Sequence, residues 1–93
     1  MVNVKVSKKG HSHYVLVPKF LSETLGLADK KLKSNYDKET KTIIYTLNEK
    51  GNVKPLNIND TIYLIVPIEV LPELPEELEI TFDDNSITYS PVG

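Results

Sequence analysis

Short runs in which apolar and polar residues alternate make up most of this chain. A period of two residues is the pattern of a β-strand with one buried face. The predicted strands are residues 2–6, 14–17, 32–36, 42–47, 61–66 and 78–82, followed by a return strand through 87–89. The polar stretches 7–12 and 56–60 hold glycine or asparagine beside charged residues and are predicted to be loops. The pattern therefore predicts a mainly β protein.

One short helix is predicted to interrupt the strands at residues 18–25. Pro18 suits the first helical position, where an N–H would have no partner in any case, and Gly26 suits the left-handed residue after the helix end. The matching stretch later in the chain holds Pro72 and Pro75, which are incompatible with a full helix. We therefore expect one short helix and one degenerate counterpart.

The chain repeats itself with a shift of 49 residues. Residues 3–5 recur as 52–54, and residues 14–18 recur as 63–67 with conservative changes. Seven of the 23 pairs between residues 3–25 and their counterparts are identical. After a few deleted residues, the later matches pair Tyr36, Asp37, Ile43 and Tyr45 with Phe82, Asp83, Ile87 and Tyr89. Self-similarity at a fixed period indicates a repeated structural unit.

Two repeats of this size need each other. Each is shorter than 50 residues, near the limit of about 40 below which a chain folds alone only with disulfides, metals or partners. The chain has no cysteine, so a disulfide cannot supply the missing stability. We therefore expect a single domain over residues 1–93, in which repeats 1–49 and 50–93 share one core.

The two repeats carry opposite charge. Residues 1–49 hold nine lysines and five acidic residues, a net charge of +4, whereas residues 50–93 hold two lysines and eight acidic residues, a net charge of −6. A basic and an acidic half indicate two different electrostatic partners, or attraction between the halves.

Composition also bears on the location of the protein. No apolar run approaches the roughly 20 residues of a membrane span. The first residues lack the apolar core of a signal peptide. Together with the absence of cysteine, these features predict a cytoplasmic protein that does not bind membranes.

Candidate catalytic and metal-binding groups are few. His11 and His13 would share one face of an extended strand, but two histidines without a third ligand make a poor metal site. Ser12 beside His13 has no recognisable orienting acid or oxyanion hole. We expect no enzyme activity, no cofactor and no metal. Tyr14 and Tyr63 are interpreted as equivalent core or interface residues.

An ordered set of short motifs resembles the swapped-hairpin DNA-binding family of AbrB, SpoVT and the MazE antitoxin. The motifs are Val6-Ser7-Lys8-Lys9-Gly10-His11-Ser12, Val15-Leu16-Val17-Pro18, Leu21, Leu25-Gly26-Leu27 and the hairpin over residues 32–47. The resemblance implies an AbrB-like β-barrel in which each subunit of a dimer swaps a β-hairpin into the other. This chain would supply both subunits itself, as two pseudo-symmetric halves with short helices.

The resemblance also implies a function. It favours a DNA-binding transcriptional regulator, the antitoxin of a type II toxin–antitoxin module, that binds its toxin and its own operator DNA. The residues expected at DNA are Lys5, Lys8, Lys9, His11, Ser12 and Lys19. The toxin would be a small basic ribonuclease that meets the acidic segment 69–84. The residues expected to contact it are Glu69, Leu71, Glu73, Leu74, Glu76 and Glu77.

Two departures from the family pattern keep an alternative open. The family usually places an arginine two residues before the motif proline, where this chain has Leu16. The second repeat also lacks the basic loop, because residues 57–60 are Asn, Ile, Asn and Asp where residues 8–11 are Lys, Lys, Gly and His. Either two chains pair their basic loops as a homodimer, or DNA binding has been weakened or lost. In the second case the chain is a protein-interaction module, toxin-neutralising or other.

Overall fold

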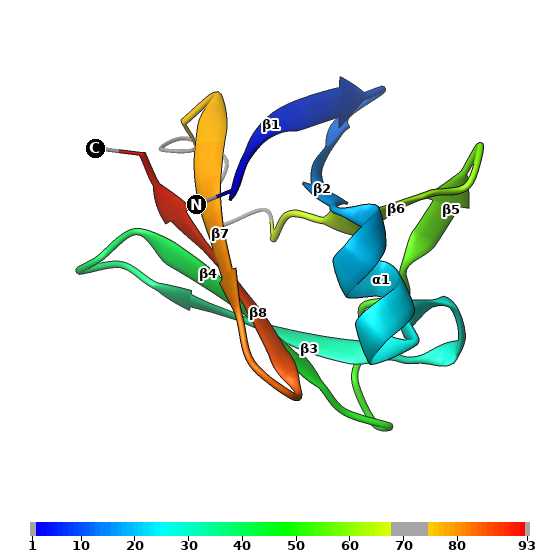
Figure 1. Cartoon of the computed structure of the whole chain (residues 1–93). Coiled ribbons are helices and arrows are strands. Elements are labelled where there is room, and N and C mark those ends of the chain that lie inside the picture. The colour runs from blue at the N-terminus through cyan, green and yellow to red at the C-terminus, as the bar shows by residue number, and fades with distance from the viewer. Residues whose placement is uncertain (1, 68–74, 93) are drawn as a thin grey trace.

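The alternating segments form one strongly curled antiparallel sheet (Figure 1). The computed structural model describes residues 2–67 and 75–92. The strands of this part of the chain are β1 (Val2–Lys9), β2 (Ser12–Val17), β3 (Leu32–Asp37), β4 (Thr42–Leu47), β5 (Leu56–Ile58), β6 (Thr61–Ile65), β7 (Glu77–Phe82) and β8 (Ser86–Pro91). They lie in the order β3-β4-β8-β7-β1-β2-β6-β5 and make a half-barrel. The prediction of a mainly β chain is confirmed.

The two predicted loops are largely strands. β1 continues to Lys9 and β2 starts at Ser12, so only two residues form the turn between them. Gly10 has a φ of 64°, which permits this tight reversal. In the second repeat, β5 occupies most of the predicted loop, and the turn consists of Asn59 and Asp60, with φ values of 52° and 67°. The loop predictions were wrong because polar residues near a hairpin tip still pair through their backbones.

Helix α1 (Lys19–Leu25) connects β2 to β3 and is followed by the 3-10 turn η1 (Leu27–Asp29). Gly26 is its left-handed C-cap with a φ of 62°, which confirms the predicted end, whereas Pro18 is the N-cap and not the first helical residue, so the helix starts one residue later than predicted. Leu21 is completely buried and anchors the helix on the core. The counterpart of this helix in the second repeat lies outside the described residues.

The core lies inside the half-barrel, and two tyrosines are its largest fully buried side chains. The rings of Tyr45 and Tyr89 meet edge to face with 5.7 Å between their centroids. The Tyr45 hydroxyl donates a hydrogen bond to the backbone carbonyl of Ile65 at 2.7 Å, and the Tyr89 hydroxyl donates one to that of Leu16 at 2.9 Å. Both buried hydroxyls therefore have the partner that burial requires.

Strand pairing between the two repeats follows the 49-residue echo. In the β2–β6 pair, Tyr14 lies opposite Ile65 and Leu16 lies opposite Tyr63. Tyr63 is the counterpart of Tyr14, and Ile65 is the counterpart of Leu16. Each contact in this pair is thus matched by its counterpart.

The β4–β8 pair has the same reciprocity. Ile43 lies opposite Tyr89, and Tyr45 lies opposite Ile87. These are the residues that the later part of the echo relates to each other. The two tyrosine hydroxyl bonds also obey the rule, because their donors are counterparts and so are their acceptors.

The beginnings of residues 1–49 and 50–93 each contact the later hairpin of the other half, one through a strand and one through a single bridge. Val4 in β1 lies opposite Leu78 in β7. Val53, the counterpart of Val4, forms a β-bridge with Leu32 at the start of β3, with hydrogen bonds of 2.8 and 2.9 Å. This bridge joins β3, at one edge of the sheet, to the residues just before β5, at the other edge.

Candidate functional site

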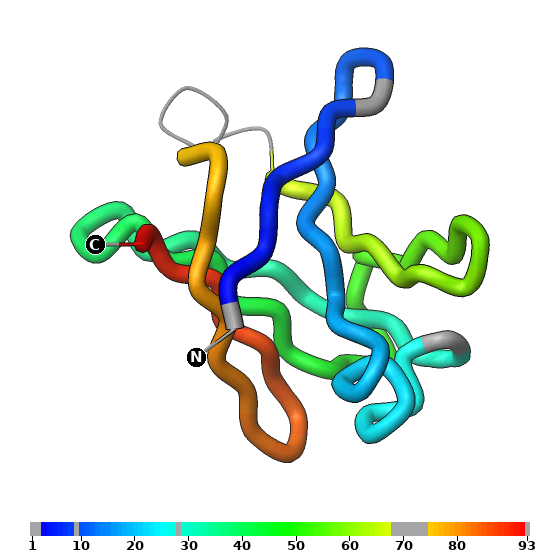
Figure 2. Tube along the Cα trace, turned by 45° about the horizontal axis from the view of Figure 1, so that its top comes forward, coloured from blue at the N-terminus to red at the C-terminus, as the bar shows by residue number. Residues whose placement is uncertain are grey.

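The β1–β2 hairpin projects from the body of the protein as an arm (Figure 2). Its end brings together four of the six predicted DNA-binding residues. Lys8 lies opposite His13, and Lys9 lies opposite Ser12. Lys8 and His11 are exposed and Ser12 is half-buried, while the side chain of Lys9 lies outside the described part of the structure. The arm can therefore offer an ammonium group and an imidazole to an anion.

The other two predicted DNA-binding residues lie elsewhere. Lys19 is exposed at the start of α1, beyond the opposite end of β2. Because a strand rises about 3.4 Å per residue, β2 puts Lys19 roughly 20 Å from the tip of the arm. Lys5 is exposed on β1, opposite Glu77 of β7. The structure therefore does not gather the six residues into one basic patch.

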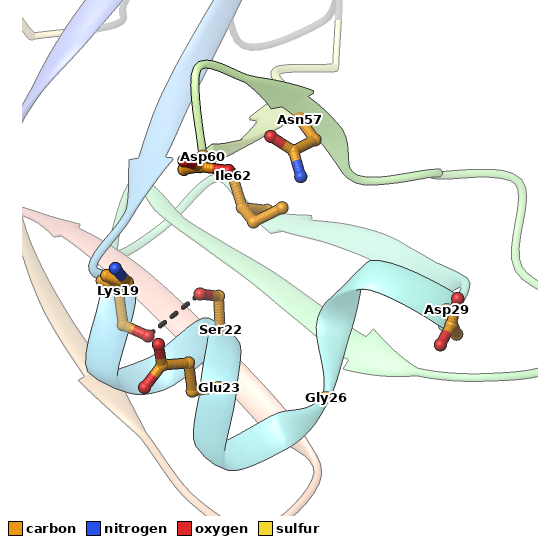
Figure 3. Close-up of a pocket in the computed structure, with 8 residues that line it drawn as sticks. All are labelled: Lys19, Ser22, Glu23, Gly26, Asp29, Asn57, Asp60 and Ile62. Atoms are coloured by element: carbon orange, nitrogen blue, oxygen red, sulfur yellow. Dashed lines mark hydrogen bonds between the residues drawn. The ribbon is translucent and has the colours of Figure 1, made fainter.

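A polar hollow of about 530 Å³ lies between α1 and the β5–β6 hairpin (Figure 3). Its lining residues are Lys19, Ser22, Glu23, Gly26, Asp29, Asn57, Asp60 and Ile62. Within the described residues, no three His, Cys, Asp or Glu side chains are grouped so that they could hold a metal ion. The Ser22 hydroxyl is engaged with the carbonyl of Lys19 at 3.0 Å. The described lining of the hollow therefore contributes acidic side chains beside the β5–β6 tip but no set of metal ligands.

Only part of the predicted toxin-binding segment can be placed. Glu69, Leu71, Glu73 and Leu74 lie outside the described residues. Glu76 and Glu77 are exposed at the start of β7, and the carbonyl of Glu76 accepts a hydrogen bond from the Val6 N–H at 2.9 Å. These two carboxylates therefore lie beside β1, near the base of the arm.

The sheet surface over β2, β6 and β5 that faces away from the core is apolar at its centre. Val15 on β2 and Leu64 on β6 point inward with no exposed surface, so their strand neighbours point outward. We define the outer face as the outward side chains of Tyr14, Leu16, Leu56, Ile58, Tyr63 and Ile65. Ile65 is 40% exposed and Leu56 is 38% exposed, while the others are half-buried, and Leu16 also packs against the core.

The outward positions on the other side of the half-barrel have a different character. On the central strands β4 and β8 they are Thr42, Ile44, Thr46, Ser86, Thr88 and Ser90, five of them hydroxyl residues. An outward sheet surface in this fold is therefore not apolar by default. The echo had singled out Tyr14 and Tyr63, but the apolar face was missed because strand register, not sequence distance, brings its members together.

No helix among the described residues is long and apolar enough to cross a lipid bilayer. No protein-family model matches the chain, and neither a curated protein nor a solved structure matches it. The geometry above is therefore the basis on which function has to be argued.

Proposed function

We propose that this chain is a swapped-hairpin protein of the AbrB/MazE type, in which two repeats of one chain replace the two subunits of a dimer. The reciprocal β2–β6 and β4–β8 pairs support this, because two copies related by a two-fold axis make every contact twice. The pairs Val4–Leu78 and Val53–Leu32 support the swap, since each joins the beginning of one repeat to the hairpin of the other, the first within a ladder and the second as a single bridge. A cytoplasmic location is part of the proposal, on the absence of cysteine.

We propose that the chain binds a protein through the outer face and no longer recognises operator DNA. The observation that carries this is the apolar character of the outward residues on β2 and β6. Tyr14, Leu16, Tyr63 and Ile65 form two directly opposed pairs there. Apolar and aromatic side chains that are depleted of charge are typical of the buried centre of a protein interface. DNA affinity depends instead on cations that neutralise phosphates, and Leu16 supplies none.

The two hairpin tips also disfavour symmetric DNA binding. A two-fold DNA reader presents the same side chains to both half-sites. Here the β1–β2 tip exposes Lys8 and His11, whereas the β5–β6 tip exposes Asn59 and Asp60. The exposed carboxylate of Asp60 would repel the phosphates of the second half-site. A single basic tip can make only half of the phosphate contacts that a two-fold symmetric DNA-binding protein makes.

A titration of the purified chain separates protein binding from DNA binding. DNA binding is measured at low salt by fluorescence anisotropy, with DNA from upstream of the chain's own coding region. Protein association is measured by light scattering, first with the chain alone and then with the protein encoded by the neighbouring reading frame. We expect no saturable DNA binding. Leu16→Lys should weaken the observed association at least tenfold, or about 1.4 kcal/mol, and Val92→Lys, an exposed residue off the outer face, should not. Saturable DNA binding, or association indifferent to Leu16→Lys, refutes the proposal.

DNA binding by the arm, with the antitoxin role, is the second candidate function. It is favoured by Lys8 and His11, which are exposed at the end of a projecting hairpin. The exposed carboxylates of Glu76 and Glu77 suit a basic toxin. In the same titration this candidate requires saturable DNA binding that Lys8→Glu weakens. The slope of log affinity against log salt concentration should fall in magnitude by about 0.9 for each phosphate contact removed.

A further inference from the structure

We infer that the occupant of the outer face is the outer face of a second copy of this chain, turned so that unlike hairpin tips meet. The inference rests on the proposed function, because it names the partner of the same surface. It follows from the symmetry of the surface and from the charge at its two ends. The small extent of the apolar centre requires those two ends to take part in the contact.

The four outer-face residues on β2 and β6 have a local two-fold relation. Tyr14–Ile65 and Leu16–Tyr63 are counterpart pairs on either side of the Val15–Leu64 pair. A surface of this kind that packs on a copy of itself repeats each favourable contact, which is the property of an isologous interface. None of the six outer-face residues is charged, so the pairing does not have to remove a charge from water.

The outer face alone is small for a stable dimer. The three strands β2, β6 and β5 have six, five and three residues and are spaced at about 4.8 Å, so the outer face covers at most roughly 15 by 20 Å, or about 300 Å². Stable interfaces bury about 800 Å² on each partner. The hairpin tips, which extend beyond the apolar centre, therefore have to take part in the contact.

The two tips lie at opposite ends of the face and differ in charge. β2 and β6 are antiparallel and each begins at a tip, so the β1–β2 tip and the β5–β6 tip point in opposite directions. Lys8 and His11 are exposed at the first tip, and Asp60 is exposed at the second, where Glu23 and Asp29 around the hollow outnumber its one cation, Lys19.

This distribution selects one orientation of the second copy. A two-fold axis that lies in the interface and is perpendicular to the line between the tips places each basic tip over the acidic tip of the other chain, twice in the dimer. An axis along that line places like tips together. Electrostatic complementarity fixes the register of an interface even where it adds little affinity. We therefore expect the antiparallel arrangement.

Sedimentation velocity and light scattering of the full chain test the dimer. At concentrations on the order of 100 µM we expect twice the chain mass of 10.5 kDa. Ile65→Lys should raise the dissociation constant at least tenfold, because it places a charge at the apolar centre. Val92→Lys changes a side chain of similar exposure that lies off the outer face and should leave the dimer intact. Circular dichroism melts verify that each variant is folded.

Charge reversal tests the orientation. Lys8→Glu combined with Lys9→Glu makes both tips non-basic and should weaken the dimer several-fold at low salt. Adding Asp60→Lys reverses the charge of the β5–β6 tip as well. Tips of opposite charge then face each other again, and dimerisation should recover. A triple variant no stronger than the double variant overturns the antiparallel arrangement.

The outcomes separate this inference from the proposed function. A chain that stays monomeric at all concentrations overturns the inference, yet the proposed function survives if another protein binds and Leu16→Lys releases it. A dimer that withstands Ile65→Lys also overturns the inference. Saturable DNA binding by the unmodified chain refutes the proposed function whatever the mass of the chain.

Discussion

At the scale of single residues, two buried tyrosines connect the halves of the sheet. Tyr45 and Tyr89 pack against each other, and each hydroxyl reaches a carbonyl on a central strand of the opposite repeat. Burial raises the pKa of the Tyr45 hydroxyl, and burial together with repulsion from a charged Tyr45 raises the pKa of the Tyr89 hydroxyl. The folded chain therefore holds both phenols in their protonated, neutral form.

These raised pKa values predict loss of stability in alkali. A raised folded pKa means that stability is complete below the unfolded value of about 10 and is lost as pH rises above it, because only the unfolded chain releases the protons. We expect the free energy of unfolding, measured with urea, to fall above about pH 10 by up to 1.4 kcal/mol per pH unit for each tyrosine.

Variants isolate the tyrosine contribution from the lysines that titrate in the same range. Tyr89→Phe should cost about 1–2 kcal/mol at neutral pH, because it leaves the Leu16 carbonyl without its donor, and should roughly halve the alkaline slope. The double change Tyr45→Phe with Tyr89→Phe should remove the tyrosine part of the slope. An unchanged slope in the double variant would contradict this assignment.

At the scale of elements, segments with local signals were predicted well. The helix ends follow from Pro18 and Gly26, and the β3–β4 hairpin follows from alternation on both sides of a polar turn. Phe82 continues the alternation of β7, yet it is 51% exposed and packs edge to face on Phe20 of α1, with 5.8 Å between the ring centroids. Its exposure could not be predicted, because alternation along a strand does not show where core packing ends.

Closure of the sheet depends on a glycine between the repeats. A side chain at Gly51 would collide with the backbone carbonyl of Leu32, the residue that bridges to Val53. We expect Gly51→Ala to destabilise the fold by about 2 kcal/mol or more in urea unfolding, because backbone rather than a flexible side chain must move.

A second glycine gives the matched control. Gly26 has open space around its Cα but a positive φ of 62°. Gly26→Ala should cost only about 1 kcal/mol, the penalty for a left-handed residue with a side chain. Equal costs at the two positions would mean that the Leu32–Val53 bridge contributes little to stability.

At the scale of the whole molecule, neither repeat contains all the partners of its own strands. β1 pairs with β7, β2 with β6 and β4 with β8, so each of these ladders joins residues before and after residue 50. The covalent link holds the halves at an effective concentration on the order of millimolar. Cutting the chain between the repeats should therefore separate folding from association.

We expect a peptide of residues 1–49 to show no cooperative thermal transition as a monomer, because its sheet and core are incomplete without the second repeat. Mixing it with a peptide of residues 50–93 should restore the β signal in circular dichroism, and the melting temperature should rise with concentration. A peptide 1–49 that melts cooperatively as a monomer would contradict the proposed swapped arrangement.

The sequence by itself determined the period-two strands, the ends of α1 and the echo between the repeats. These properties are local or are repeated at a fixed distance, so they can be read from residues such as Pro18, Gly26 and Tyr14. Tertiary structure alone decided that polar residues 7–9 extend β1, that Lys19 lies apart from Lys8, and that Leu16 meets Tyr63. The physical reason is that pairing register and sheet curvature depend on the backbone hydrogen bonds and core packing of the whole chain.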